Sequence, residues 1–242
     1  MNILTSEVDY QVGDITHRGF VAFNDLTSPP RTGVMVIHEW WGLNDYIKNR
    51  AKKLAELGYV AFAIDMFGEG KVAGDPDEAA SLMNAVLGDM DSGTKALQAG
   101  YQALVDQPQV DAERTAAIGY CFGGAMALHM ARIGLPLSAV VSFHGALGSF
   151  HTATPGSIRP RVLVCHGEED SMVTMDDVAG FKQEMDTAQA DYQVNLYPNA
   201  KHGFTNEAAD ENGQKYGLDL GYNALADNKS WDAMETLFDE VF

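Results

Sequence analysis

The sequence predicts an α/β fold in which a mostly parallel, twisted sheet of about seven or eight strands carries helices on both faces and no large lid. Apolar runs of strand length alternate with stretches of helical spacing, and a tight Gly-x-Cys-x-Gly turn at residues 119–123 joins one of these strands to one of these helices. The 242 residues show no internal repeat and no shift in composition. We therefore expect a single domain over residues 1–242.

The first half of the chain is expected to form a hairpin, two further strands and three helices. An alternating pattern of side chains that is interrupted by a turn at Gly13-Asp14 predicts the antiparallel hairpin. Continuous apolar runs predict strands buried on both faces, and Asn44-Asp45 can cap a helix that stops at Gly58. In chain order we expect strands near 7–12, 15–23, 33–37 and 59–64, with helices after Asn44 and at 76–88 and 94–106, the last two split by residues 88–93.

The second half is expected to alternate strands and helices more regularly. Small and β-branched residues at 115–118 predict a buried strand before the Gly-x-Cys-x-Gly turn, and helix formers at 125–131 follow it. Further strands are expected at 139–143, 160–165 and 192–197, and further helices at 174–189 and 222–240, whereas the polar, glycine-containing stretch 205–221 is expected to be loop.

The composition is that of an acidic enzyme. Sixteen basic and 34 acidic side chains give a formal net charge of −18, which repels phosphate backbones and anionic lipid, so we expect neither nucleic acid nor a membrane as partner. We see no signal peptide, and the two cysteines, Cys121 and Cys165, form no disulfide framework. We expect a cytoplasmic protein, monomeric or a small homo-oligomer, that acts on a small molecule.

The turn at residues 119–123 has the form of a nucleophile elbow, a strained connection between a strand and a helix. Glycines at 119 and 123 avoid the collisions that side chains would cause there. The turn lifts Cys121 to a helix N-terminus, where free N–H groups favour an anion. A free cysteine is often only a small buried residue, but such a residue needs no strained turn. We therefore predict that Cys121 is a nucleophile.

Reactive side chains also follow other predicted strands, at the edge where parallel sheets gather functional residues. Glu39, Asp170 and His202 take such positions, and the order cysteine, acid, histidine is that of an α/β-hydrolase triad. We predict that His202 is the general base toward the thiol and the acid toward the leaving alkoxide. Asp170 is predicted to accept the Nδ1–H bond of that histidine, with Glu169 as the next candidate in a turn that is otherwise typical of solvated acids.

Four segments together resemble the dienelactone hydrolase family of α/β-hydrolases. The resemblance implies hydrolysis of esters or lactones by a Cys-His-Asp triad, here Cys121, His202 and Asp170, with no cofactor. The matching segments span most of the chain in the family's order and read His38-Glu39-Trp40-Trp41-Gly42, Gly119-Tyr120-Cys121-Phe122-Gly123-Gly124, Gly167-Glu168-Glu169-Asp170-Ser171-Met172-Val173 and Tyr197-Pro198-Asn199-Ala200-Lys201-His202-Gly203-Phe204.

The resemblance also implies a role for Glu39. It implies that the Cys121 thiol is hydrogen-bonded to Glu39 in the resting enzyme, and that substrate binding moves the cysteine or displaces the carboxylate. A carboxylate beside a thiolate raises the thiol pKa by repulsion, so the thiol would stay protonated until an ester arrives. The alternative is a loop acid paired with Arg50 or Lys48. Position and resemblance further name the backbone N–H groups of Phe122 and Trp40 as the oxyanion hole.

Several other side chains near strand ends are candidates for the wall of an apolar pocket, with plain core residues as the equal alternative. We name Trp40, Trp41, Phe67, Phe122, Phe143, His144 and Phe204, and we interpret His166 as structural. No histidine spacing typical of a metal site is present, so we expect no metal.

One departure from the family pattern narrows the substrate. Family members named for dienelactone hydrolysis carry an arginine shortly after the histidine, whereas here Thr205-Asn206-Glu207 follows Phe204. We therefore predict a neutral ester or lactone as the substrate. The alternative is hydrolysis of neutral phosphate triesters by the same triad, as a main or side activity. A redox-sensing or catalytically inactive binding protein is a third interpretation, which the intact acid and base disfavour.

Overall fold

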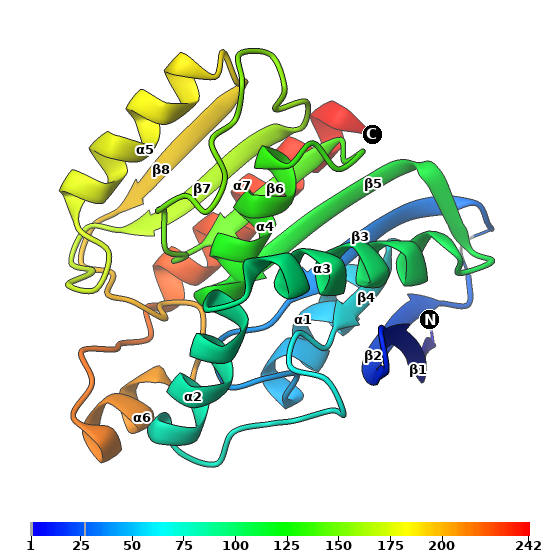
Figure 1. Ribbon diagram of the computed structural model, residues 1–242, viewed down its shortest axis with the longest axis horizontal. Helices are drawn as coiled ribbons and strands as arrows, with labels where there is room; N and C mark the ends of the chain where they lie inside the picture. Colours follow the sequence, from blue (N-terminus) through cyan, green and yellow to red (C-terminus); the bar gives the residue numbers. More distant parts are fainter. Residues whose placement is uncertain (1, 27) are drawn as a thin grey trace. The chain divides into compact units, whose positions relative to one another are not determined.

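The computed structural model describes residues 2–26 and 28–242. Its strands form an eight-stranded sheet in the order β1-β2-β4-β3-β5-β6-β7-β8 (Figure 1), and the predicted mostly parallel α/β fold is confirmed. In chain order the elements are β1 (Ile3–Val12), β2 (Ile15–Asn24), β3 (Arg31–Ile37), α1 (Asp45–Glu56), β4 (Val60–Ile64), α2 (Pro76–Leu87), α3 (Met90–Val105), β5 (Val110–Tyr120), α4 (Phe122–Arg132), β6 (Ala139–Phe143), β7 (Arg161–Gly167), α5 (Met175–Thr187), β8 (Tyr192–Tyr197), α6 (Ala209–Tyr216) and α7 (Ala224–Val241).

The chain divides into two compact units, Met1–Ile118 and Gly119–Phe242, which we call the N-terminal and the C-terminal unit. Strand β5 begins in the first unit and ends in the second. The expectation of a single domain over residues 1–242 stays a prediction.

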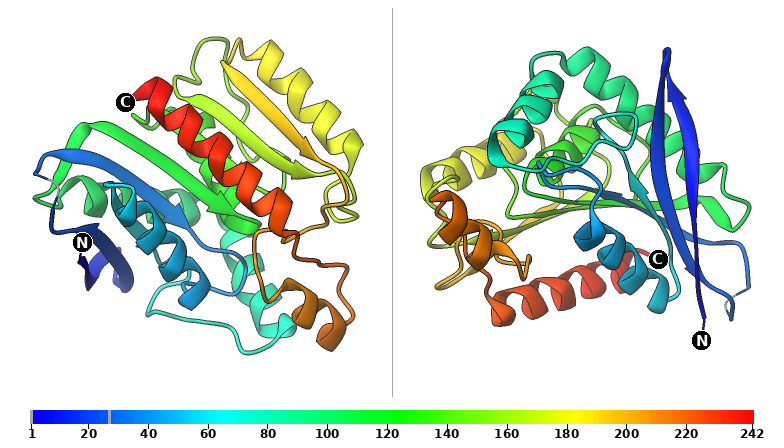
Figure 2. Two further views of the ribbon diagram at one scale, coloured as in Figure 1. Left: turned by 180° about the vertical axis from the view of Figure 1, so that it is seen from behind. Right: turned by 90° about the horizontal axis from the view of Figure 1, so that it is seen from below.

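The N-terminal unit brings two strand ends side by side. Strands β3 and β4 pair in parallel from Gly33 with Val60 to Ile37 with Ile64, so the residues after Ile37 and after Ile64 leave the sheet together. All residues of both strands are buried, which explains their continuous apolar runs. The β1–β2 hairpin adds two antiparallel strands beside β4, and α1 and α3 cover opposite faces of these strands (Figure 2).

The C-terminal unit gathers three further strand ends. Strands β6, β7 and β8 pair in parallel, with Phe143 opposite Cys165 and Gly167 opposite Tyr197. Helices α4 and α5 lie on one face of these strands, and α7 lies on the other (Figures 1 and 2). The loops that begin at His144, Glu168 and Pro198 therefore leave the same edge of the sheet, which is the edge where we expect function.

Two helices differ from the sequence prediction. Helix α3 begins at Met90, and Gly93 lies inside it instead of separating it from α2. Asp89 causes this early start, because its side chain caps the helix by accepting a hydrogen bond from Ser92 N (3.1 Å). Helix α6 lies inside the stretch 205–221 that we expected to be loop, and it ends at Gly217 in the left-handed conformation (φ 67°).

The strands agree more closely with the prediction. Strand β6 has the predicted bounds, whereas β5 and β7 are longer than expected. The predicted Asn44 cap of α1 is confirmed, because its side chain accepts a hydrogen bond from Ile47 N (3.3 Å). None of the helices in the described residues is long and apolar enough to span a bilayer.

Candidate active site

Cys121 lies at the sharp turn between β5 and α4. Its φ of 53° and ψ of −116° are strained for a residue with a side chain, as a nucleophile elbow requires. A Cβ on Gly119 would lie 1.9 Å from the carbonyl oxygen of Gly123, so no other residue fits there. The backbone N–H of Cys121 donates to Phe143 O (3.0 Å), which fixes the elbow against the end of β6. Cys121 is partly exposed, which its predicted role as a nucleophile requires.

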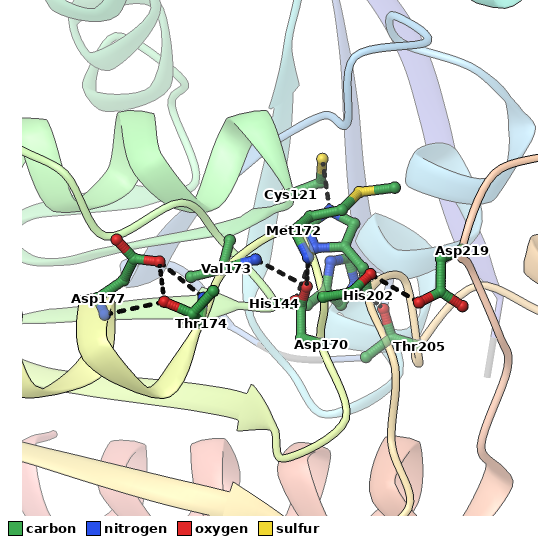
Figure 3. Close-up of polar contacts among 11 residues, drawn as sticks. Cys121, His144, Asp170, Met172, Val173, Thr174, Asp177, His202, Thr205 and Asp219 are labelled. Carbon is green, nitrogen blue, oxygen red and sulfur yellow. Dashed lines mark hydrogen bonds and ion pairs between the residues drawn. The ribbon is translucent and has the colours of Figure 1, made fainter.

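His202 connects the thiol to a carboxylate. Its Nε2 lies 3.0 Å from Cys121 Sγ, and its Nδ1 lies 2.8 Å from Asp170 Oδ2 (Figure 3). His202 is 6% exposed and lies in the loop after β8. The His202 carbonyl accepts a hydrogen bond from Gly221 N (3.2 Å), which connects this loop to the segment before α7. The structure thus brings together the three residues that the sequence predicts as nucleophile, base and acid.

Asp170 is held by its own turn. Its Oδ1 accepts hydrogen bonds from the backbone N–H groups of Met172 (2.8 Å) and Val173 (2.9 Å), which leaves Oδ2 for His202. The turn follows Gly167, where a Cβ would lie 2.3 Å from the Ala200 carbonyl oxygen of the histidine loop. The glycine in the sequence motif therefore allows the acid turn and the histidine loop to touch.

The charges of these groups are set by one another. Burial lowers the pKa of His202, but the charges of Cys121 and Asp170 and their hydrogen bonds outweigh burial and raise it well above its ordinary value. Burial likewise acts to raise the pKa of Asp170, but His202 and the N–H groups of Val173 and Met172 lower it below its ordinary range. The protonated form of His202 is therefore favoured beside these two partners.

Asp219 joins the loops that carry the acid and the histidine. Its Oδ2 accepts a hydrogen bond from Ser171 Oγ (2.6 Å), and its Oδ1 accepts one from Lys201 Nζ (2.6 Å). Ser171 follows Asp170 in the chain, and Lys201 precedes His202. One carboxylate thus bridges the sequence neighbours of both residues.

The predicted pocket residues of the C-terminal unit are buried. Phe143, His144 and Phe204 are each at most 1% exposed, and Phe143 stacks on Tyr120 with ring centroids 4.8 Å apart. His144 contacts His202, as described below. Their burial agrees with the core alternative, and their place in a substrate pocket stays a prediction.

The N-terminal unit carries Glu39 in a loop fixed by its neighbour. His38 Nδ1 lies 2.5 Å from the carbonyl oxygen of Glu39, and its Nε2 accepts a hydrogen bond from Met66 N (3.1 Å). The ring of His38 also packs on Phe67, at 4.7 Å between centroids. The Glu39 side chain is 5% exposed. The contacts of His38 with Met66 and Phe67 therefore connect the loop after β3 to the loop after β4.

The two tryptophans of this loop differ in exposure. Trp41 is buried and Trp40 is half-buried, with their rings in edge contact at 5.1 Å. The predicted roles of Glu39 as a thiol restraint and of Trp40 as an oxyanion donor both concern Cys121, which belongs to the other unit. Both roles stay predictions, as does that of the Phe122 N–H.

Asp65 is a buried acid of the N-terminal unit that the sequence analysis did not name. Its buried carboxylate accepts hydrogen bonds from the backbone N–H groups of Phe67 (2.9 Å), Gly68 (2.9 Å) and Gly70 (2.8 Å), so it shapes the loop after β4. A signal was present, because an acid directly follows an apolar strand at Ile64. Asp219 and Thr205 were also missed, and neither stands in a recognisable pattern.

The residues that follow the histidine motif offer no cation. Thr205 is fully buried and Asn206 is 6% exposed, whereas Glu207 points to solvent. Within residues 2–26 and 28–242, no group of three or more His, Cys, Asp or Glu side chains is arranged to hold a metal ion.

The strand order and the elbow are those of an α/β-hydrolase. The chain belongs to the dienelactone hydrolase family, whose model matches residues 18–242. It is therefore a hydrolase.

Similar proteins support this assignment. A solved structure described as a dienelactone hydrolase-like promiscuous phosphotriesterase from metagenomic libraries is 38% identical, with a TM-score of 0.92 and 100% of both chains covered. A second structure, named m3DLH, is 39% identical, with a TM-score of 0.92 and 99% of both chains covered. Protein usf of Aquifex pyrophilus is 29% identical over 209 residues, which cover 84% of this chain and 88% of that protein.

Proposed function

We propose that this protein hydrolyses small neutral esters or lactones, without a cofactor, through Cys121, His202 and Asp170. The observation that carries the proposal is the continuous path from Cys121 Sγ to His202 Nε2 (3.0 Å) and from His202 Nδ1 to Asp170 Oδ2 (2.8 Å). Both distances are within the reach that proton transfer between a nucleophile and its base requires.

In the first half of the reaction, the Cys121 thiol passes its proton to His202 Nε2 and its sulfur attacks the carbonyl carbon. The negative charge that develops on the carbonyl oxygen is held by the oxyanion hole, which we assign to the backbone N–H groups of Phe122 and Trp40. When the tetrahedral intermediate collapses, the C–O bond breaks and His202 gives its proton to the leaving alkoxide. A thioester to Cys121 remains.

In the second half, His202 takes a proton from water, and the hydroxide attacks the thioester carbon. The C–S bond breaks, the carboxylic acid leaves, and the sulfur recovers the proton from His202. Asp170 holds the Nδ1–H bond throughout, so it keeps the ring in the orientation that serves both halves. A thioester is more electrophilic than an oxyester, which favours turnover at this step.

The charge of the protein favours a neutral substrate. The formal net charge is −18, and the sequence after His202 offers Asn206 and Glu207 where an anion would need a cation. We therefore expect p-nitrophenyl acetate or butyrate to be hydrolysed faster than a dienelactone that bears a carboxylate.

Glu39 is proposed to restrain the thiol in the resting enzyme. The activated thiol would instead use the contact between Cys121 Sγ and His202 Nε2 (3.0 Å). We expect Glu39→Gln to move the pH profile of Cys121 alkylation to lower pH, because a like charge is removed. An unchanged profile would exclude the restraint.

The decisive test of the function is Cys121→Ala. We expect loss of ester hydrolysis by about a thousandfold or more, because a member of a unit that acts together is removed. Mass spectrometry of the wild-type enzyme quenched during turnover should find the acyl group on Cys121. Hydrolysis by Cys121→Ala at the wild-type rate would overturn the proposal.

A second candidate reaction is hydrolysis of neutral phosphate triesters. It is favoured by the 38% identical structure that is described as a promiscuous phosphotriesterase. Cys121 Sγ would attack phosphorus and expel the aryloxide, and water would then break the P–S bond to release the dialkyl phosphate and the thiol. Parallel assays with p-nitrophenyl butyrate and p-nitrophenyl diethyl phosphate test it, and absence of p-nitrophenol release from the phosphate would exclude it.

A further inference from the structure

We propose that His144 is a positioning residue for His202, acting through ring packing and through its hydrogen bond to Thr205. The inference rests on the proposed function, since it takes His202 as the base. His144 is 0% exposed, so its effect on the reaction is exerted through His202 and not through contact with substrate.

The ring of His144 meets the ring of His202 edge to face. The two centroids are 5.4 Å apart and the planes are inclined by 67°. On its other sides, the His144 ring contacts Phe204 at 5.2 Å and Tyr120 at 6.1 Å. Close contact with a well-packed ring restricts the rotation of the His202 side chain, on which the 3.0 Å approach of Nε2 to Cys121 Sγ depends.

Thr205 connects His144 to the backbone of the same loop. His144 Nε2 lies 2.7 Å from Thr205 Oγ1, and Thr205 is also 0% exposed. Thr205 comes three residues after His202, so the imidazole of His144 holds both the side chain of the base and the loop that carries it (Figure 3).

The turn that carries His144 is itself fixed to the nucleophile. The preceding carbonyl, Phe143 O, accepts the hydrogen bond of Cys121 N (3.0 Å), and His144 N donates to Cys165 O (2.8 Å). His144 has a φ of 39°, a strained value for a residue with a side chain. Such strain persists only where the surroundings determine the conformation, and it is common at functional sites. One turn thus sets the backbone of the nucleophile and the ring of the base.

The next glycine strengthens this link. A Cβ on Gly145 would lie 2.8 Å from Gly124 Cα in the first turn of α4, so the two backbones are in direct contact. His144 therefore keeps its place relative to the elbow without the help of a flexible side chain. Among the described residues of the C-terminal unit, Cys121, Asp170 and His144 contact His202, and His166 interacts with it electrostatically.

The test uses substitutions that separate packing from hydrogen bonding. His144→Phe keeps a ring but loses the bond, Thr205→Val keeps the shape but loses the hydroxyl, and Thr205→Ser restores the hydroxyl. The matched control is His129→Phe, because His129 is also buried (3% exposed) on α4 but its ring contacts Phe150.

Two readouts are needed. The first is kcat and KM for p-nitrophenyl butyrate. The second is the pH profile of iodoacetamide alkylation, which reports on Cys121 because Cys165 is fully buried and burial raises its pKa to about 12. A positioning role moves kcat and the alkylation profile, whereas a purely structural role moves only thermal stability.

We expect His144→Phe and Thr205→Val to lower kcat about tenfold while KM changes less than about twofold. Their alkylation profiles should move to higher pH, because a displaced imidazolium stabilises the thiolate less. Thr205→Ser should recover most of the activity, and the double variant His144→Phe/Thr205→Val should be no worse than the worse single one.

Wild-type kcat and alkylation profile in Thr205→Val and His144→Phe would overturn the inference, as would losses confined to thermal stability like those of His129→Phe. If His144→Phe does not fold, the comparison of Thr205→Val with Thr205→Ser tests the inference by the same two readouts. Failure of the proposed function is distinguishable, because only that failure leaves Cys121→Ala active.

Discussion

Two of the buried histidines that follow strand ends, His202 and His38, have opposite surroundings. His202 follows β8 and has a carboxylate on Nδ1 and a thiol on Nε2. His38 follows β3 and has the carbonyl of Glu39 on Nδ1 and the N–H of Met66 on Nε2. The partners of His202 are ionisable side chains, whereas these partners of His38 are backbone groups, which carry no charge.

The pKa values of the two histidines move in opposite directions. Burial lowers the pKa of His38, and the Glu39 carbonyl and the charge of Asp65 offset this only in part. Burial also acts to lower the pKa of His202, but Cys121 and Asp170 raise it well above its ordinary value. Position at a strand end therefore does not set the charge of a histidine, and the charged partners decide in which direction its pKa moves.

The largest expected effect is that of His202→Gln. We expect kcat for p-nitrophenyl butyrate to fall about a thousandfold, because the base, the acid and the partner of the thiolate are removed together. Iodoacetamide alkylation of Cys121 at neutral pH should slow in parallel. A variant with fast alkylation and lost hydrolysis would show that His202 serves proton transfer but does not stabilise the thiolate.

His38→Gln should have a much smaller effect on the reaction. We expect kcat to fall about tenfold, since the loops after β3 and β4 lose a fixed connection and the proposed oxyanion donor at Trp40 shifts. The alkylation profile of Cys121 should not move, because His38 carries no proton for the thiol. A fall in kcat as large as that of His202→Gln would contradict the distinction between the two histidines.

Much of this arrangement could be predicted from the sequence. Strand ends are visible because buried parallel strands are continuous apolar runs, and the predicted site residues Cys121, Asp170 and His202 directly follow such runs or close turns. The glycines at 119 and 167 mark close backbone approaches that no side chain allows. The local sequence pattern therefore predicts those site residues whose positions are set by the local backbone geometry.

The parts that were missed depend on contacts between distant residues. Helix α6 has only eight residues, most of them polar and one of them Gly213, so its sequence has the composition of a loop. Thr205 stands out only through its contact with His144. Asp219 stands out only through its contacts with Ser171, 48 residues away, and with Lys201, 18 residues away. No spacing rule connects such pairs, because they meet only after the sheet has formed.

The pH dependence of stability tests the neutral state of His38. A histidine with a lowered pKa in the folded state contributes its stability above its ordinary pKa of 6.5, and this is lost as pH falls through the folded value. A raised pKa, as in His202, has the opposite sign. We expect His38→Gln to remove part of the loss that the wild type shows below pH 6.5, measured as the urea midpoint from pH 8 to pH 5. Equal acid slopes in both proteins would indicate that His38 is protonated in the folded state.

The smallest expected effect concerns Asp219, whose exposed carboxylate joins the loops that carry Asp170 and His202. Asp219→Asn should lower kcat by about twofold, because exposed ion pairs are screened and contribute little. The loss should be greatest at low salt and vanish at high salt, where the Lys201 contact is screened in the wild type as well. Asp239→Asn is the matched control, since it removes the same charge from an exposed position on α7. If both variants lose activity equally, net charge is the cause, and the two triad loops hold their positions without the Asp219 bridge.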